Sequence, residues 1–249
     1  MSLSVRKKQY LKNMGIQIWD ARFQLPGEKT FSNADVESVV SKSLPVNEYP
    51  VVIQSPSIAK HKNPEEWKSL QQEVAHCTTC DLHLTRTNTV FGVGDTTTDL
   101  MIIGEAPGQE EDRQGQPFVG RAGQLLTQML MAIGFTREKV FIANILKCRP
   151  PNNRDPQVDE VVHCAGFLKR QIEWIQPKLI LSVGRISAHN LLQKTEAIGK
   201  LRGKVYQHPE FGIPVIVTYH PAYLLRSPQE KIKSWNDLVL AKRILQDTV

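Results

Sequence analysis

Four short, almost entirely apolar runs constrain the fold more than any other feature of the chain. They cover residues 100–103, 140–145, 179–184 and 214–219. Runs of this length and composition are typical of strands that are buried on both faces. Segments with helical spacing of apolar residues lie between them, and strands that alternate with helices usually pair in parallel. The sequence therefore predicts an α/β fold, with a mostly parallel sheet covered by helices on both faces.

The helices can be placed from capping signals and from the spacing of apolar residues. Asn63 precedes Pro64, and a capping residue followed by proline at the first helical position starts a helix. Amphipathic spacing predicts this helix to about residue 76 and further helices at about 121–133, 158–174, 186–193 and 234–246. A hairpin-like segment is expected to begin at Val205.

Residues 1–62 differ from the rest of the chain. Between residues 24 and 63, prolines punctuate a Ser-, Val- and Lys-rich segment without helical period. This composition is typical of a linker or a poorly ordered arm. We therefore expect an N-terminal extension at 1–62, partly disordered, and one globular domain at 63–249.

Charge and hydropathy limit the cellular setting. The chain has no run of eighteen apolar residues and no apolar segment behind its basic N-terminus, so we expect no membrane span and no secretory signal. The cytoplasm is the expected compartment, without a membrane partner. A net charge of +6 is compatible with a polyanionic partner, but a basic groove would have to come from local clustering.

Three chemistry-bearing residues are predicted to meet at one edge of the sheet. Glu105 follows the first strand, Asn144 lies near the end of the second, and His220 follows the fourth. Ligand groups of open α/β sheets sit beyond the carboxyl ends of the strands. The loop after the first strand is also longer than a connector requires, and it carries an acidic cluster and the lone aromatic Phe118. These features predict a single binding site.

The chain contains only four cysteines, namely Cys77, Cys80, Cys148 and Cys164. Cys77 and Cys80 form a C-x2-C pair, which is a metal-chelating spacing. A cytoplasmic protein is not expected to hold structural disulfides. The spacing leaves three interpretations open: zinc bound by four thiolates, a [4Fe-4S] cluster, and a redox C-x-x-C pair with two unrelated thiols.

Three further segments stand out beside the four cysteines: GEAPGQEEDRQGQPFVGRAGQLL, NILKCRPPNNRDP and HPAYLLR. Together these motifs resemble the family 4 uracil-DNA glycosylases of the uracil-DNA glycosylase superfamily, and they occur in the family's order from about Trp67 to the C-terminus. The resemblance implies a three-layer α/β/α sandwich with a four-stranded, mostly parallel sheet. It also implies a structural [4Fe-4S] cluster held by Cys77, Cys80, Cys148 and Cys164. Residues 1 to about 60 have no counterpart in the usual family pattern.

The resemblance implies a DNA repair enzyme that flips uracil out of DNA and hydrolyses its N-glycosidic bond. Such an enzyme needs a closed pocket for the extruded base. Phe118 would stack on the pyrimidine, Asn144 would read its O4 and N3–H edge, and His220 would donate to O2 as charge develops. The backbone of Glu105, Ala106 and Pro107 would also contact the base.

The acid that positions the water is less clearly marked. Family 1 enzymes carry a site turn resembling GQDPYH, with Asp at the position that Ala106 holds here. Family 4 proteins similarly lack this acid. Glu105 and Glu111 are the candidates to orient water or to stabilise the sugar cation, and Glu111 is slightly favoured for the electrostatic role.

DNA contacts are predicted next to the site histidine. Leu224 and Leu225 are expected to act as an apolar wedge, with Arg226 and Arg121 on flanking phosphates. Further cations for the DNA backbone are expected to be Lys147, Arg149, Arg154 and Arg185. The expected partner is uracil-containing DNA, single- or double-stranded, bound by a monomer.

Two other classes of function remain open. A catalytically weak relative could keep the fold and the cluster and only bind DNA or another partner, although Phe118, Asn144 and His220 argue against it. A redox protein could use Cys77 and Cys80 alone, although Cys148 and Cys164 argue against that.

Overall fold

The computed structural model of this protein describes residues 63–247, together with Gln9. The extension expected at 1–62 lies, apart from Gln9, outside the described residues, so its organisation stays a prediction. The described part of the chain holds no helix of the length and hydropathy needed to cross a membrane.

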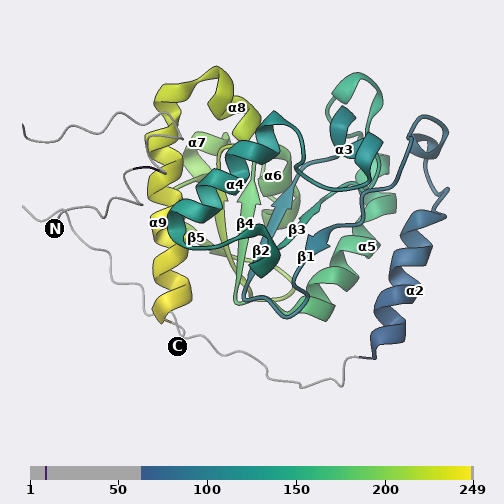
Figure 1. The fold of residues 1–249 in the computed structure, drawn as a ribbon, viewed down its shortest axis with the longest axis horizontal. Helices are drawn as coiled ribbons and strands as arrows, with labels where there is room; N and C mark the ends of the chain where they lie inside the picture. The colour runs from purple at the N-terminus through teal and green to yellow at the C-terminus, as the bar shows by residue number, and fades with distance from the viewer. Residues whose placement is uncertain (1–8, 10–62, 248–249) are drawn as a thin grey trace, which may run out of the picture. The chain divides into compact units, whose positions relative to one another are not determined.

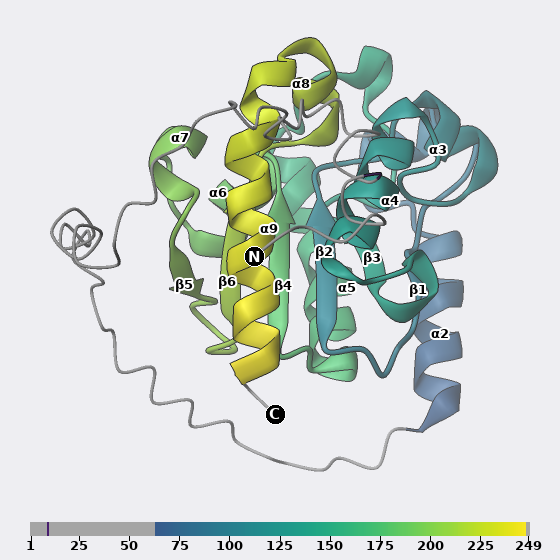
Figure 2. The same cartoon turned by 60° about the vertical axis from the view of Figure 1, so that its left-hand side comes forward.

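One six-stranded sheet organises the described residues. Its strands are β1 (Val93–Gly94), β2 (Leu100–Gly104), β3 (Phe141–Asn144), β4 (Leu179–Val183), β5 (Val205–Gln207) and β6 (Pro214–Thr218). Their order across the sheet is β1-β3-β2-β4-β6-β5, which Figure 2 shows from β5 on the left to β1 on the right. The inner strands β3, β2, β4 and β6 are parallel. The expected α/β fold with a mostly parallel sheet is therefore confirmed.

The sheet is wider than the four strands that the sequence predicted. β1 pairs with β3, and β5 pairs with β6, both antiparallel at opposite edges. β1 has two residues and β5 has three, which is too short to show a period of two in the sequence. β5 does confirm the hairpin-like segment expected from Val205.

The helices follow the predicted alternation with the strands. The α-helices are α2 (Pro64–Ala75), α3 (Gln109–Gln114), α4 (Arg121–Ile133), α5 (Val158–Ile175), α6 (Arg185–Leu192), α7 (Ile198–Leu201), α8 (Pro221–Arg226) and α9 (Lys231–Asp247). Short 3-10 helices lie at Asp81–Leu84, Arg137–Lys139, Pro151–Asn153 and Pro228–Glu230. The first helix begins as predicted, because the Asn63 side chain accepts a hydrogen bond from the backbone N–H of Glu65.

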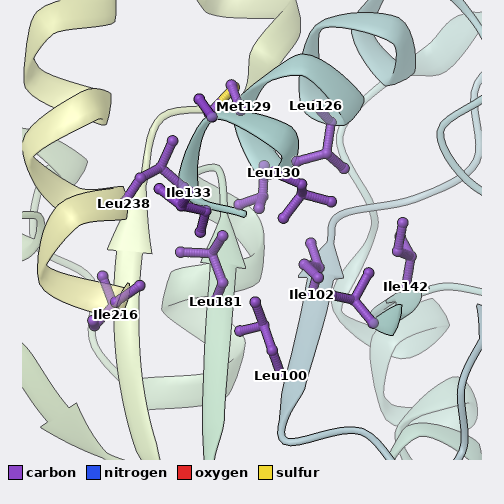
Figure 3. Packing of buried hydrophobic residues seen from close by; sticks show 14 of the residues in the cluster. Leu100, Ile102, Leu126, Met129, Leu130, Ile133, Ile142, Leu181, Ile216 and Leu238 are labelled. Carbon is purple, nitrogen blue, oxygen red and sulfur yellow. The ribbon is translucent and has the colours of Figure 1, made fainter. Parts of the chain in front are cut away.

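The core consists of two apolar layers, one on each face of the sheet. Alternate residues of β2 separate them: Leu100 and Ile102 pack under α4 and α9, while Met101 and Ile103 pack under α5 and α6. Figure 1 shows these helix pairs on opposite sides of the strands. Figure 3 shows the side chains of α4 and of Leu238 meeting those of the sheet in the first layer. Because side chains on both faces of the sheet are packed in the core, the positions of the strand ends are fixed.

Two short helices stand where the sequence indicated only loops. α3 lies in the long segment after β2, and α8 begins directly after the site histidine that follows β6. Both lie beyond the carboxyl ends of the parallel strands, at the top of Figure 1. They form the walls of the cavity described next.

Candidate active site

A cavity of about 420 Å³ opens at the carboxyl ends of β2, β3 and β6. Pockets for small molecules usually measure ≈ 300–1,000 Å³, so this volume suits a single base with part of its sugar. It brings together the seven residues that the sequence analysis placed around the base or in catalysis: Glu105, Ala106, Pro107, Glu111, Phe118, Asn144 and His220. It is also lined by Gly108, Ala122, Pro150, Asn153, Arg154, Ala222 and Arg226. The predicted convergence of separate strand ends on one site is therefore present.

Asn144 ends β3 and is buried, with 2% of its surface exposed. Its side-chain Oδ1 has no hydrogen-bond partner among the described residues. Gly104 makes room for it, because a Cβ at residue 104 would lie 2.4 Å from Asn144 Oδ1 and 2.6 Å from the Phe118 ring. A buried amide oxygen without a partner costs free energy, so this atom is poised to accept from a ligand.

Phe118 is only 6% exposed and belongs both to the cavity lining and to the core layer under α4. Its backbone has φ of 53°, in the left-handed region that residues other than glycine rarely adopt. The ring centroid lies 5.7 Å from that of His220, with the planes tilted by 32°. The two rings therefore face the same cavity from different elements.

His220 caps α8, and the capping hydrogen bond shows which of its two ring nitrogens carries the proton. Its Nδ1 accepts from the backbone N–H of Ala222 at 3.2 Å, so the neutral ring carries its proton on Nε2. Burial lowers the pKa of His220 to about 4, and the nearby Arg226 lowers it further while Glu111 opposes the shift. His220 is therefore a neutral hydrogen-bond donor near pH 7.

Gly184, at the end of β4, leaves the space in which His220 sits. A Cβ on this glycine would lie 3.2 Å from the Cβ of His220 and 3.3 Å from its Cδ2. Gly184 also has φ of 100°, which strains any other residue. Like β2 at Gly104, β4 thus approaches the site through a residue without a side chain.

Glu105 has the perturbed acidity expected of a group with a chemical role. Burial raises the pKa of Glu105 to about 7, the negative charge of Asp155 adds to the shift, and Arg185 opposes it. Glu105 lines both the main cavity and a second cavity of about 470 Å³ beside it, which also contacts Tyr219 and Tyr223. Its carboxyl group can therefore exchange a proton near neutral pH.

The three acids of the loop cluster have three different roles. Glu110 is exposed and pairs with Arg113 on the surface. Asp112 is buried and accepts backbone hydrogen bonds from the neighbouring segment at Thr87 and Asn88. Glu111 lines the cavity, and its Oε1 accepts from the backbone N–H groups after Phe118 at 2.9 Å and 3.0 Å. One carboxylate oxygen of Glu111, the acid favoured for the electrostatic role, thus holds the loop that carries Phe118.

Two predicted DNA contacts need correction. Leu224 is fully buried in the core layer under α4, so it cannot act as a wedge. Leu225 is 37% exposed, because adjacent residues of a helix point about 100° apart and only one of them faces the core. Lys147 is also buried, at 1% exposure, and donates to the Asn144 carbonyl and to Gln171 at 2.9 Å and 2.7 Å. It therefore does not contact a DNA backbone.

The predicted arginines differ in how they are held. Arg121 and Arg226 are exposed, and the latter lines both cavities. The other three have protein partners: Arg185 pairs with Asp155, Arg154 pairs with the buried Glu160, and Arg149 donates to Asn153. Arg185 is exposed like Arg121 and Arg226, but its guanidinium is engaged by the carboxylate of Asp155.

The four cysteines line one narrow cavity, together with apolar side chains and the polar residues Thr79, Arg86, Lys147 and Glu160. Two of their sulfurs accept hydrogen bonds: Cys148 from the guanidinium of Arg86 at 3.1 Å, and Cys164 from the backbone N–H of Lys147 at 3.2 Å. Burial raises the pKa of the Cys164 thiol to about 11. Within residues 63–247, no three His, Cys, Asp or Glu side chains are arranged to hold a single metal ion.

Several residues of the site were missed by the sequence analysis. Ala222 supplies only a backbone N–H, and Gly184 supplies only space, so neither carries a chemical signal in the sequence. Arg137 reaches the Phe118 loop from a 3-10 helix nineteen positions away. Contacts of this kind depend on the tertiary fold.

Comparison with known proteins agrees with this geometry. The family model of the uracil DNA glycosylase superfamily matches residues 91–239. The type-4 uracil-DNA glycosylase of Archaeoglobus fulgidus is 46% identical over 171 residues, covering 66% of this chain and 86% of that protein. The type-4 enzymes of Saccharolobus solfataricus and Thermotoga maritima are 48% and 45% identical, over 64% and 66% of this chain and 77% and 85% of theirs. The chain therefore belongs to the uracil-DNA glycosylase superfamily and, within it, to the type-4 family.

Proposed function

We propose that this protein removes uracil from DNA by hydrolysing the N-glycosidic bond and leaves an abasic site. The observation that carries the proposal is the buried, unpartnered Oδ1 of Asn144 in a cavity shared with Phe118 and His220. Uracil carries an N–H at position 3 that can satisfy this acceptor. Cytosine presents an acceptor at the same position and would leave the amide oxygen unpaired, which is costly in a buried site.

Recognition begins when the target nucleotide leaves the base stack and enters the cavity. Phe118 supplies the apolar ring on one wall of the cavity, against which a pyrimidine can stack. Asn144 then accepts from N3–H and donates to O4 with its side-chain amide. The backbone of Glu105 and Ala106 completes the wall at the carboxyl end of β2.

Bond cleavage places negative charge on the departing base. The C1′–N1 bond breaks with its electron pair on uracil, and the resulting charge spreads onto O2. The neutral His220 donates its Nε2 proton in a hydrogen bond to that oxygen, which stabilises charge where it develops. A neutral imidazole is the suitable donor, because it keeps its proton as the anion leaves.

Water completes the reaction at C1′. We assign Glu105 to accept the proton from this water, because the residue lines the cavity and burial raises its pKa to about 7. The oxygen of the water becomes the hydroxyl of the abasic sugar. Glu111 also lines the cavity and holds the loop backbone with one oxygen, and from there its charge can stabilise the sugar cation.

Contacts outside the cavity would hold the DNA. Arg226 and Arg121 present exposed guanidinium groups for phosphates. Leu225 and Tyr223 are exposed on α8 next to the cavity, at 37% each. They, and not the buried Leu224, are the side chains that could fill the gap that the flipped base leaves in the base stack.

We further propose a structural [4Fe-4S] cluster held by Cys77, Cys80, Cys148 and Cys164. The support is the set of donors: the four thiols come from three separate segments of the chain and line one cavity, and four cysteine thiolates are the usual ligands of a [4Fe-4S] cluster. The charges around the cavity also fit a cluster. Lys147 is a buried cation that takes part in no ion pair among the residues described, and the nearby thiolates would balance its positive charge. When bound, the cluster would crosslink the chain before the sheet to the segment after β3.

The activity is tested with a labelled oligonucleotide that contains one uracil, followed by alkaline cleavage of abasic sites. The wild-type chain should cleave the uracil strand and leave matched cytosine and thymine strands intact. Asn144→Asp should lose uracil cleavage and gain weak cleavage at cytosine, because a carboxylate accepts from the amine at C4. Arg113→Met, which removes an exposed surface pair, is the matched control and should match the wild type. No cleavage by the wild type would overturn the proposal.

A further inference from the structure

The loop that carries Phe118 is held from two sides by groups of opposite charge. The carboxylate of Glu111 accepts from the backbone N–H groups of Val119 and Gly120. On the other side the guanidinium of Arg137 donates to the carbonyls of Pro117 and Phe118, at 2.8 Å and 3.0 Å. Each of these four consecutive residues thus has one backbone group bound by a charged side chain.

Arg137 is suited to this contact by position and by chemistry. It stands on the 3-10 helix Arg137–Lys139, between α4 and β3. Two nitrogens of one planar guanidinium reach two successive carbonyls, a fork that the point charge of lysine cannot reproduce. Partial burial lowers the pKa of Arg137 while Glu138 and Glu111 oppose the shift, so the group remains charged.

The backbone at Phe118 needs such support. Its φ of 53° is a strained conformation for a residue with a side chain, and it persists only where the surroundings impose it. Space is also limited on the helix side, since a Cβ at Gly123 would lie 1.8 Å from the Phe118 carbonyl oxygen. Relaxation of this backbone would rotate the ring away from the cavity.

We propose that Arg137 is a positioning residue for base recognition: by binding the carbonyls of Pro117 and Phe118, it holds the Phe118 ring in the wall of the base cavity. The inference rests on the proposed uracil-DNA glycosylase activity for its catalytic consequence. Its structural part, the position of the ring, can be measured without that activity.

A double-mutant cycle tests the catalytic consequence. Arg137→Met keeps an unbranched side chain but removes the fork, and it should lower the single-turnover rate on uracil-containing DNA by about 10²-fold, as misplacement by an ångström does. Arg137→Lys should remain nearly as slow, because it restores the charge without the fork. In a Phe118→Leu background, Arg137→Met should change the rate by less than about threefold, since the two sites act as one unit.

A spectroscopic readout tests the position of the ring. The Phe118 ring lies 5.7 Å from the His220 imidazole, so its ring current shifts the His220 proton resonances. Arg137→Met should move the His220 signal, which is assigned with His220→Gln, whereas the control Arg113→Met should leave it in place. Should Arg137→Met fail to fold, by thermal melting, Arg137→Lys carries the same measurements.

The outcomes are separable. If the wild type and Arg113→Met do not cleave uracil-containing DNA, the proposed function fails, and the His220 resonance still decides the role of Arg137. An unshifted resonance in both Arg137 variants would overturn the inference. A rate loss of equal size with and without the Phe118 ring would overturn it too, because Arg137 would then act elsewhere.

Discussion

At the scale of single residues, the site separates two proton-bearing groups by their surroundings. Burial holds the pKa of His220 near 4 and raises that of Glu105 to about 7. At neutral pH the histidine is an uncharged donor, and the glutamate lies near the midpoint of its titration. One cavity therefore contains a hydrogen-bond donor whose protonation does not change near pH 7 and a base whose protonation does. The proposed hydrolysis requires the first for the departing base and the second for the water.

Removal of the His220 imidazole should affect chemistry more than folding. His220→Ala should slow single-turnover cleavage of uracil-containing DNA by ~10²–10³-fold, the usual loss for one donor to a developing anion. Its affinity for DNA that carries an abasic site should stay close to that of the wild type. A variant that cleaves within a few-fold of the wild-type rate would show that another group stabilises the departing base.

The pH dependence of the rate reports on Glu105. If its carboxylate accepts the proton of the water, the single-turnover rate should rise through pH 7 and level off above it, because only the ionised form accepts. His220 should add no inflection between pH 5 and 8, since its pKa lies near 4. Glu105→Gln should be slow and flat over this range. A rise through pH 7 that survives in Glu105→Gln would assign the titration to a different residue.

At the scale of elements, α8 combines a core contact with a surface contact. Leu224 is fully buried, whereas Tyr223 and Leu225 are each 37% exposed. The Nδ1 contact of His220 fixes the first turn of the same helix. One six-residue helix thus orients the donor, anchors it in the core and presents side chains to solvent next to the cavity, where we propose that DNA binds.

Substitutions in α8 should separate these contacts. Leu224→Ala should lower the free energy of unfolding by about 2–5 kcal/mol through the cavity it leaves. Leu225→Ala should leave the melting temperature nearly unchanged, but should slow cleavage of duplex DNA more than cleavage of single strands, where the base is already unstacked. Equal rate losses on both DNA forms would argue that Leu225 does not enter the duplex.

Sequence patterns predicted the elements that are buried on both sides and missed those that are short. The four inner strands appear as continuous apolar runs because both of their faces are covered. The helix at 221–226 gave no such signal, and without it the two adjacent leucines looked equivalent. Lys147 looked like a surface cation, since its partners Gln171 and the Asn144 carbonyl are brought to it by the fold. Residue chemistry was therefore easier to predict than residue environment.

At the scale of the whole molecule, the cysteine cavity lies next to the segment that follows Asn144. The Cys164 sulfur accepts from the backbone of Lys147, whose side chain in turn binds the Asn144 carbonyl. Contacts thus connect α5, through the segment after β3, to the proposed base-reading residue. The chain therefore places its proposed cluster where it can stabilise the site without contacting the substrate.

Loss of one proposed ligand should affect stability before specificity. Purified wild-type protein should contain iron and sulfide at about four each per chain. Cys164→Ala should lower both contents and the melting temperature, and the remaining folded fraction should still prefer uracil to cytosine. His163→Ala, the exposed neighbour on the same helix, should change neither content. Stoichiometric zinc without iron after anaerobic purification would contradict the cluster.

The lack of a side chain at Gly184 has a consequence for how amino-acid substitutions in this protein should be interpreted. The imidazole of His220 occupies the space beside that residue, so even an added methyl group at 184 would press on the ring in a backbone already at φ of 100°. In a deep mutational scan, position 184 should tolerate as few alternatives as His220, although Gly184 takes no part in the proposed chemistry. A map of intolerant positions would then mark the outline of the site as strongly as its reactive groups.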